Sequence, residues 1–150
     1  MQRQDLLFEY PDIIRVFHDP EAGLLVHEWL EYNPEGSDNV IFEILDRIFQ
    51  AFQETGVNKV LIIADKANSA FSPEVQKYVR KIQFPRIIQS TALRYLATVV
   101  GANEPVQQQV SAWRDILIDV EEIELNDVLS EEEGREWLSQ FPASPGLTPD

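Results

Sequence analysis

The first part of the chain alternates short apolar runs with turn-forming residues. The runs cover residues 6–9, 13–17 and 24–30. A Tyr-Pro-Asp turn at residues 10–12 separates the first two runs, and residues 19–23, which include a proline and a glycine, precede the third. Proline and glycine in short breaks between β-rich runs indicate hairpins. The pattern therefore predicts three antiparallel strands.

After this region the apolar positions change to a helical spacing. Ser37 or Asp38 is suited to cap a helix, and Gly56 is suited to end it. Between them, apolar side chains recur at i, i+4, i+7 and i+11, which places them on one helix face: Ile41, Leu45, Ile48 and Phe52. The spacing predicts an amphipathic helix.

Two continuous apolar runs follow, with helix signals between them. Residues 60–64 are all apolar, which is typical of a strand covered on both faces in a parallel sheet. The Ser-Pro pair at residues 72–73 is expected to cap and open the next helix. Pro85 is expected to kink this helix or to restart it over residues 86–89. Residues 93–100 then predict a further strand.

The C-terminal part predicts two more helices and one more strand. The Glu-Pro pair at residues 104–105 opens a helical pattern, and a short strand is expected around residues 122–125. Ser130 and Glu133 have the spacing of a capping box at the start of the last helix. Residues 141–150 hold three prolines and one glycine, and we expect them to form a flexible tail.

Together these elements predict an α/β fold. Strands and helices alternate after the initial β meander, which implies a mixed sheet with antiparallel N-terminal strands followed by parallel β-α units and about four helices. The chain has 150 residues, the size of one domain. We expect a single domain over residues 1–140.

Composition limits the classes of function. The chain has no cysteine, which excludes a disulfide framework, a thiolate metal site and a cysteine nucleophile. No run approaches the ~18 apolar residues of a membrane span, and the start lacks the basic and apolar regions of a signal peptide. We therefore expect a cytoplasmic protein without a membrane span.

The net charge is −14, which argues against non-specific binding to nucleic acid. Residues 119–150 contain ten acidic residues and one basic residue, a net charge of −9. Residues 66–94 reverse the sign, with one acidic residue and six basic residues: Lys66, Lys77, Arg80, Lys81, Arg86 and Arg94. The simplest explanation is a set of solvated helix faces, and the alternative is a basic contact surface.

Catalytic motifs are mostly absent. The sequence has no glycine-rich phosphate loop, no G-x-S-x-G and no H-E-x-x-H. The two histidines, His18 and His27, lie in the N-terminal β region, and His27 and Glu28 would point to opposite faces of a strand. Neither histidine is predicted to be a metal ligand or a general base. We expect no metal and no cofactor.

A polar cluster follows the strand at residues 60–64. Asp65, Asn68, Ser69 and Ser72 lie between this strand and the next helix, where open α/β sheets bind their ligands. The structural alternative is that Ser72 caps the helix while Asp65 and Asn68 shape the turn.

Several segments resemble the SpoIIAA-like branch of the STAS domain family, which is named for bacterial anti-sigma factor antagonists and sulfate transporters. The segments are LLFEYPDIIRVFHDPEAGLLVHEW, ETGVNKVLIIAD and SPEVQKYVRKIQFPR before LRYLATVV. Their form, including the Ser-Pro-Glu and Phe-Pro-Arg elements, is similar to that of uncharacterised STAS-like proteins of Bacteroidetes-type bacteria. The resemblance spans about residues 6–140.

The resemblance implies a sheet flanked by helices that works as a non-enzymatic protein-interaction switch. In the anti-sigma antagonists a serine of an Asp-Ser-Ser-Gly motif is phosphorylated. The matching positions here are Ala70, Phe71, Ser72 and Pro73, so only the second serine is kept. We therefore do not expect the phospho-switch, although Ser69 is a nearby substitute.

We expect a regulatory or protein-interaction module. Its partner would be another protein, for example one with an acidic surface, or a second copy of the chain. The predicted ligand or partner-binding residues are Asp65, Asn68, Ser69, Ser72, Lys77, Arg80, Lys81 and Arg86. One alternative is a small-molecule or lipid-binding domain, and a remote alternative is a hydrolase that uses Asp65.

Overall fold

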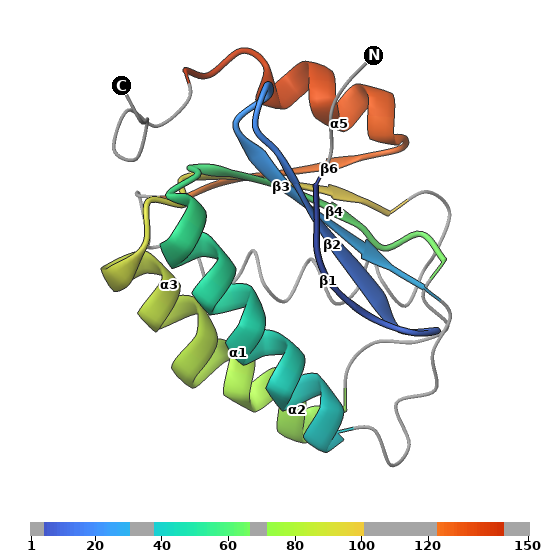
Figure 1. Cartoon of the computed structure of the whole chain (residues 1–150), viewed down its shortest axis with the longest axis vertical. Coiled ribbons are helices and arrows are strands. Elements are labelled where there is room, and N and C mark those ends of the chain that lie inside the picture. Colours follow the sequence, from blue (N-terminus) through green and yellow to red (C-terminus); the bar gives the residue numbers. More distant parts are fainter. Residues whose placement is uncertain (1–4, 31–37, 67–71, 101–122, 143–150) are drawn as a thin grey trace.

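The fold is built on one mixed sheet. A computed structural model describes residues 5–30, 38–66, 72–100 and 123–142. Its sheet has six strands in the order β1-β2-β3-β4-β5-β6, so every strand pairs with its neighbours along the chain. Helices cover both faces of the sheet (Figure 1). The predicted α/β class and the change from antiparallel to parallel strands are confirmed.

The N-terminal half of the sheet is an antiparallel meander. It consists of β1 (Asp5–Tyr10), β2 (Ile14–Asp19) and β3 (Leu24–Trp29). In the second hairpin, Asp19 Oδ1 accepts a hydrogen bond from the Ala22 N–H at 3.0 Å. This side-chain bond stabilises the turn in the way typical of aspartate.

The C-terminal half of the sheet is parallel. β4 (Lys59–Ile63) pairs with β3 on one side and with β5 (Tyr95–Val99) on the other. β6 (Glu124–Val128) pairs with β5 and forms one edge of the sheet. The last strand begins two residues later than expected, while the other predicted strands agree with the structure to within two residues at each end.

Helix α1 (Asp38–Thr55) crosses from β3 to β4 and packs its apolar stripe on the sheet. It ends at Gly56, which adopts a φ of 67° and whose N–H donates to Phe52 O at 3.0 Å. A residue with a side chain is strained at this φ. The predicted helix and its glycine stop are therefore confirmed.

The second crossover is one continuous helical segment with a π-helical middle. It comprises α2 (Pro73–Tyr78), the π-helix η1 (Val79–Gln83) and α3 (Phe84–Ser90). The Phe84 N–H donates to Val79 O, five residues back. A proline such as Pro85 has no N–H and collides with the carbonyl four residues before it, so a wider turn ahead of it relieves both problems.

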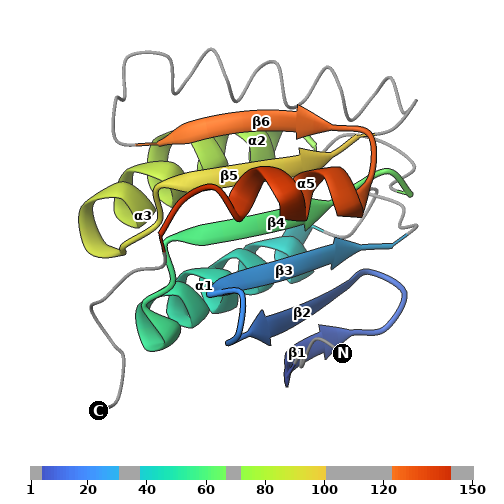
Figure 2. The same ribbon diagram turned by 90° about the horizontal axis from the view of Figure 1, so that it is seen from above.

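Helix α5 (Glu131–Leu138) lies alone on the opposite face among the described residues and contacts β4, β5 and β6 (Figure 2). The Ser130 hydroxyl accepts the Glu133 N–H at 3.2 Å, and Glu133 Oε2 accepts the Leu129 N–H at 3.1 Å. The predicted cap is present, with the glutamate reaching one residue further back than in a standard capping box.

The described residues contain three helical segments where about four were expected, because the helix predicted from residues 104–105 lies outside them. At the C-terminus, Phe141 stacks on Tyr95 with ring centroids 4.0 Å apart. Asn58 Nδ2 donates to Pro142 O at 3.0 Å. The first two residues of the expected tail thus contact the fold, and the rest of that segment lies outside the described residues.

Candidate functional site

The loop predicted to bind a ligand is described only at its two ends. Asp65 follows β4 and is exposed. Ser72 caps α2, and its hydroxyl accepts the Val75 N–H at 3.3 Å. Asn68 and Ser69 lie outside the described residues. The structural role predicted for Ser72 is therefore present, and a binding role for this loop stays a prediction.

The basic residues of the following helix lie on its outer surface. Lys77, Arg80 and Lys81 are exposed, and none of them forms an ion pair with the described part of the chain. Ile82, next to them in the sequence, is 47% exposed. An exposed isoleucine beside three cations is a surface that combines apolar area with positive charge.

Arg86 differs from these three cations because it is held inside the fold. Its Nη2 and Nε donate to Gln83 Oε1 at 2.6 Å and 3.0 Å, and its Nη1 donates to Asp46 Oδ1 at 3.2 Å. The guanidinium carbon also lies 4.4 Å from the centre of the Phe49 ring. These contacts attach α3 to α1, so Arg86 acts as a clamp between the two helices.

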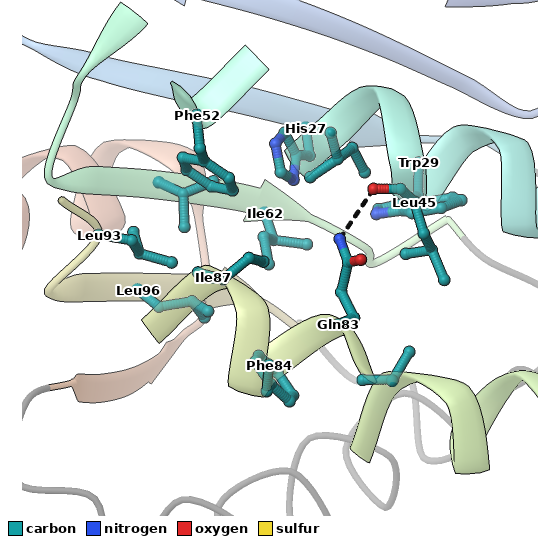
Figure 3. Close-up of a pocket in the computed structure, with 13 residues that line it drawn as sticks. His27, Trp29, Leu45, Phe52, Ile62, Gln83, Phe84, Ile87, Leu93 and Leu96 are labelled. Atoms are coloured by element: carbon teal, nitrogen blue, oxygen red, sulfur yellow. Dashed lines mark hydrogen bonds between the residues drawn. The ribbon is translucent and has the colours of Figure 1, made fainter. Parts of the chain in front are cut away.

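A small pocket lies between the sheet and the helices α1, η1 and α3 (Figure 3). It has a volume of about 60 Å³, whereas sites for drug-sized ligands measure about 300–1,000 Å³. Of the residues that line it, only His27 and Gln83 carry polar groups apart from the Trp29 indole. The pocket is therefore small and largely apolar.

His27 is the unusual member of this pocket. It is 3% exposed, its Nε2 has no hydrogen-bond partner among the described residues, and its ring packs edge-on against Phe52 with centroids 5.7 Å apart. Burial lowers the pKa of His27 to about 3, because a charged imidazolium loses its hydration there. The imidazole is thus neutral at physiological pH.

Gln83 reaches the pocket because of the π-helical turn. Its Nε2 donates to Leu45 O at 2.9 Å, and its side chain is buried. In a regular α-helix, positions four residues apart drift around the axis. The wider π turn reduces this drift, so Val75, Val79, Gln83 and Ile87 are all buried.

Sequence reasoning missed the burial of His27 and Gln83. The alternation of β3 contained a signal, because His27 shares a face with Leu25 and Trp29. For Gln83 no such signal was available, since the π-helical turn changes which helix positions face the core.

In the described ranges, no group of three or more His, Cys, Asp or Glu side chains is arranged to hold a metal ion. No helix within them is long and apolar enough to cross a membrane.

Comparisons with known proteins do not assign a family. No protein-family model matches the chain, and no curated protein is similar to it in sequence.

Proposed function

We propose that this protein is a STAS-like interaction module that binds an acidic protein surface through the outer face of α2 and η1. The contact residues would be Lys77, Arg80, Lys81 and Ile82, which we call the basic face. Support comes from the sheet topology, which agrees with the fold that the SpoIIAA-like resemblance implies.

One observation carries the proposal: three exposed cations and an exposed isoleucine occur within residues 77–82 of one helical segment, in a chain whose net charge is −14. Most positive charges of such a chain are expected to pair with its own carboxylates, as Arg15 does with Glu9 and Glu28. Cations left without an internal partner steer an acidic partner by long-range attraction. The exposed side chain of Ile82 adds apolar contact area that loses water on binding.

The lipid-binding alternative receives less support from the geometry. The apolar pocket of about 60 Å³ is smaller than the cavity of about 150 Å³ that is known to bind benzene. An acyl chain would need α1 to separate from η1 and α3, which the Arg86–Asp46 contact and the hydrogen bond from Gln83 to Leu45 O oppose.

The experiment compares two variants with the same change in net charge. The first is Lys77→Gln/Arg80→Gln/Lys81→Gln on the basic face. The control is Asn39→Asp/Gln53→Glu/Gln140→Glu, which alters three exposed residues elsewhere. The wild type and each variant are cross-linked in extracts of the organism that produces the protein. Mass spectrometry then quantifies the proteins that cross-link to each of them.

We expect the basic-face variant to lose the cross-linked partner and the control to keep it. Ile82→Asp should weaken recovery as well, because it removes the apolar part of the contact. Equal recovery by the wild type and the basic-face variant would contradict the proposal. If the partner is a second copy, sedimentation of the purified protein will show a dimer that dissociates as salt is raised.

The hydrolase alternative has its own test. A phosphatase and esterase screen of the wild type and Asp65→Asn measures whether the loop after β4 performs chemistry. Under our proposal neither protein is active. Activity that disappears in Asp65→Asn would replace the interaction module with an enzyme.

A further inference from the structure

A second cavity lies on the α5 face of the sheet, apart from the basic face. It has a volume of about 320 Å³, within the range of about 300–1,000 Å³ typical of small-molecule sites. Its walls are formed by the turn between β2 and β3, the first residue of β4 and the end of α5. Two cationic side chains line it, Lys59 and Arg135.

Arg135 is oriented by two carboxylates. Its Nη1 donates to Asp19 Oδ2 at 2.9 Å and its Nε donates to Glu131 Oε2 at 3.0 Å. Asp19 is completely buried, and the Arg135 side chain is 14% exposed. The remaining nitrogen, Nη2, is buried and has no hydrogen-bond partner among the described residues. Arg135 is therefore held in place with one donor group unused.

Lys59 is a largely buried lysine that has no counter-ion among the described residues. It is 4% exposed and shares the α5 face of β4 with Leu61. Within the described ranges it forms no ion pair and no side-chain hydrogen bond. Burial lowers its pKa because the ammonium loses hydration. The stem of Lys59 is buried and its ammonium is partly desolvated, so a negatively charged group beside it would be favourable.

We propose that this cavity binds a small anion through a carboxylate or phosphate group, with Lys59 as the principal contact and Arg135 as the second. Both side chains are hydrogen-bond donors only, so the complementary ligand is rich in acceptor oxygens and negatively charged. Charge-assisted hydrogen bonds of this kind are stronger than neutral ones.

The wall of the cavity also limits the ligand. Glu21 lines it and is exposed, so it repels anions from one side. A compact anion that contacts Lys59 and stays away from Glu21 fits this distribution better than a polyanion such as nucleic acid. The Ser139 hydroxyl, which donates to Glu136 O at 2.7 Å, keeps lone pairs for a ligand that carries a hydroxyl group.

The test uses sodium phosphate and sodium succinate as probes, with sodium chloride at equal ionic strength as the reference. The proteins are the wild type, Lys59→Met and the control Lys66→Met, which removes an exposed lysine. Methionine keeps the length and apolar stem of Lys59 without the charge, so Lys59→Met is expected to fold. Calorimetric titration and the NMR signal of the lysine Cε carbon report binding.

We expect at least one probe to bind the wild type and Lys66→Met, and to raise the pKa of Lys59. The loss of a charged hydrogen bond should weaken binding by Lys59→Met about tenfold or more. A ligand at ten times its Kd should raise the wild-type Tm by roughly 3–6 °C. Phosphate binding without succinate binding would identify the ligand group as phosphate, and the reverse would identify a carboxylate.

Equal binding by all three proteins, or no Lys59-dependent binding of either probe, would overturn the proposal. The end of α5 lines the cavity, and α5 covers the face of the sheet opposite α2 (Figure 2). The result is therefore independent of whether the basic face binds a partner.

Discussion

The two faces of the sheet accommodate buried polar groups in opposite ways. On the face covered by α1, α2 and α3, a large apolar core surrounds His27, and the imidazole is neutral. On the face covered by α5, a smaller core lies beside the Asp19–Arg135 ion pair. The face covered by α1, α2 and α3 (the large face) thus removes a charge by shifting a pKa. The face covered by α5 (the small face) keeps the charges of Asp19 and Arg135 and pairs them, although Lys59 on the same face has no ion-pair partner among the described residues.

The difference follows from the amount of apolar surface that each helix layer supplies. The three helical elements of the large face bury a large apolar cluster against the sheet, and the Arg86–Asp46 ion pair between them is partly exposed. Helix α5 has only eight residues, and of its side chains only Leu138 is completely buried. The packing of α5 on the sheet depends on the close approach of Gly134 to Leu61 and on the Arg135–Asp19 ion pair. Substitutions of polar residues are therefore expected to lower the free energy of unfolding more on the small face than on the large face.

The largest effect is expected when the ion pair of the small face is broken. In Arg135→Met, Asp19 would remain buried with only the Ala22 N–H as a described partner. Removing one partner of a buried pair costs about 3–5 kcal/mol of unfolding free energy. Urea denaturation measures this loss.

Two controls define the cause of that loss. The double variant Asp19→Asn/Arg135→Met should recover part of the stability, because no unpaired charge is left. Arg15→Met breaks two exposed ion pairs and should cost no more than about 1 kcal/mol. A loss in Arg135→Met as small as that of Arg15→Met would show that the two faces do not differ in this way.

The next effect concerns acid stability on the large face. The pKa of His27 is about 3 in the folded protein, against 6.5 for the free side chain. Between these values the unfolded chain binds a proton that the folded one does not, so the free energy of unfolding falls as pH falls from 6.5 towards 3. The slope is at most about 1.4 kcal/mol per pH unit.

His27→Leu should remove this contribution, so its stability should decline less than that of the wild type between pH 6.5 and pH 4.5. The carboxylates contribute equally to the pH dependence of stability in both proteins. The difference between the two curves of unfolding free energy against pH therefore gives the contribution of His27. His18→Gln serves as the control and should keep the steeper decline. Parallel curves for the wild type and His27→Leu would mean that the imidazole is protonated inside the fold.

The smallest effect is expected at Gly134, where α5 approaches the sheet. A Cβ there would lie 2.6 Å from Leu61 Cδ1 and 3.2 Å from Val128 Cγ2. Overpacking costs about 1–3 kcal/mol, and the better helix propensity of alanine returns about 1 kcal/mol. We expect Gly134→Ala to lower the free energy of unfolding by about 1 kcal/mol, which thermal denaturation measures.

Leu61→Val tests the cause of this loss, because valine lacks the Cδ1 atom that would collide. The double variant should be more stable than the sum of the single effects predicts. Glu136→Ala, at an exposed position of the same helix, should be nearly neutral. A neutral or stabilising Gly134→Ala would mean that α5 can move away from the sheet at little cost.

Only some properties of the predicted binding residues could be inferred from the sequence. The cap by Ser72 followed from a local Ser-Pro signal, and the exposure of Lys77, Arg80 and Lys81 agrees with their absence from the apolar stripe of the helix. Arg86 belongs to the same run of basic residues, yet its partner Asp46 lies 40 residues away. Linear charge patterns do not contain such pairings.

Local signals in the sequence were sufficient to predict the described strands and helices, their order and the mixed character of the sheet. Periodicity, caps and glycine stops act within a few residues, so the strands of the meander, α1 and the start of α5 follow from short segments. Two properties follow from the packing of the layers alone: His27 is buried as a neutral base, and Lys59 has no counter-ion among the described residues. The same packing also brings Arg135 to Asp19 across 116 residues of chain. These properties depend on desolvation and on contacts between distant segments, which arise only when the layers pack.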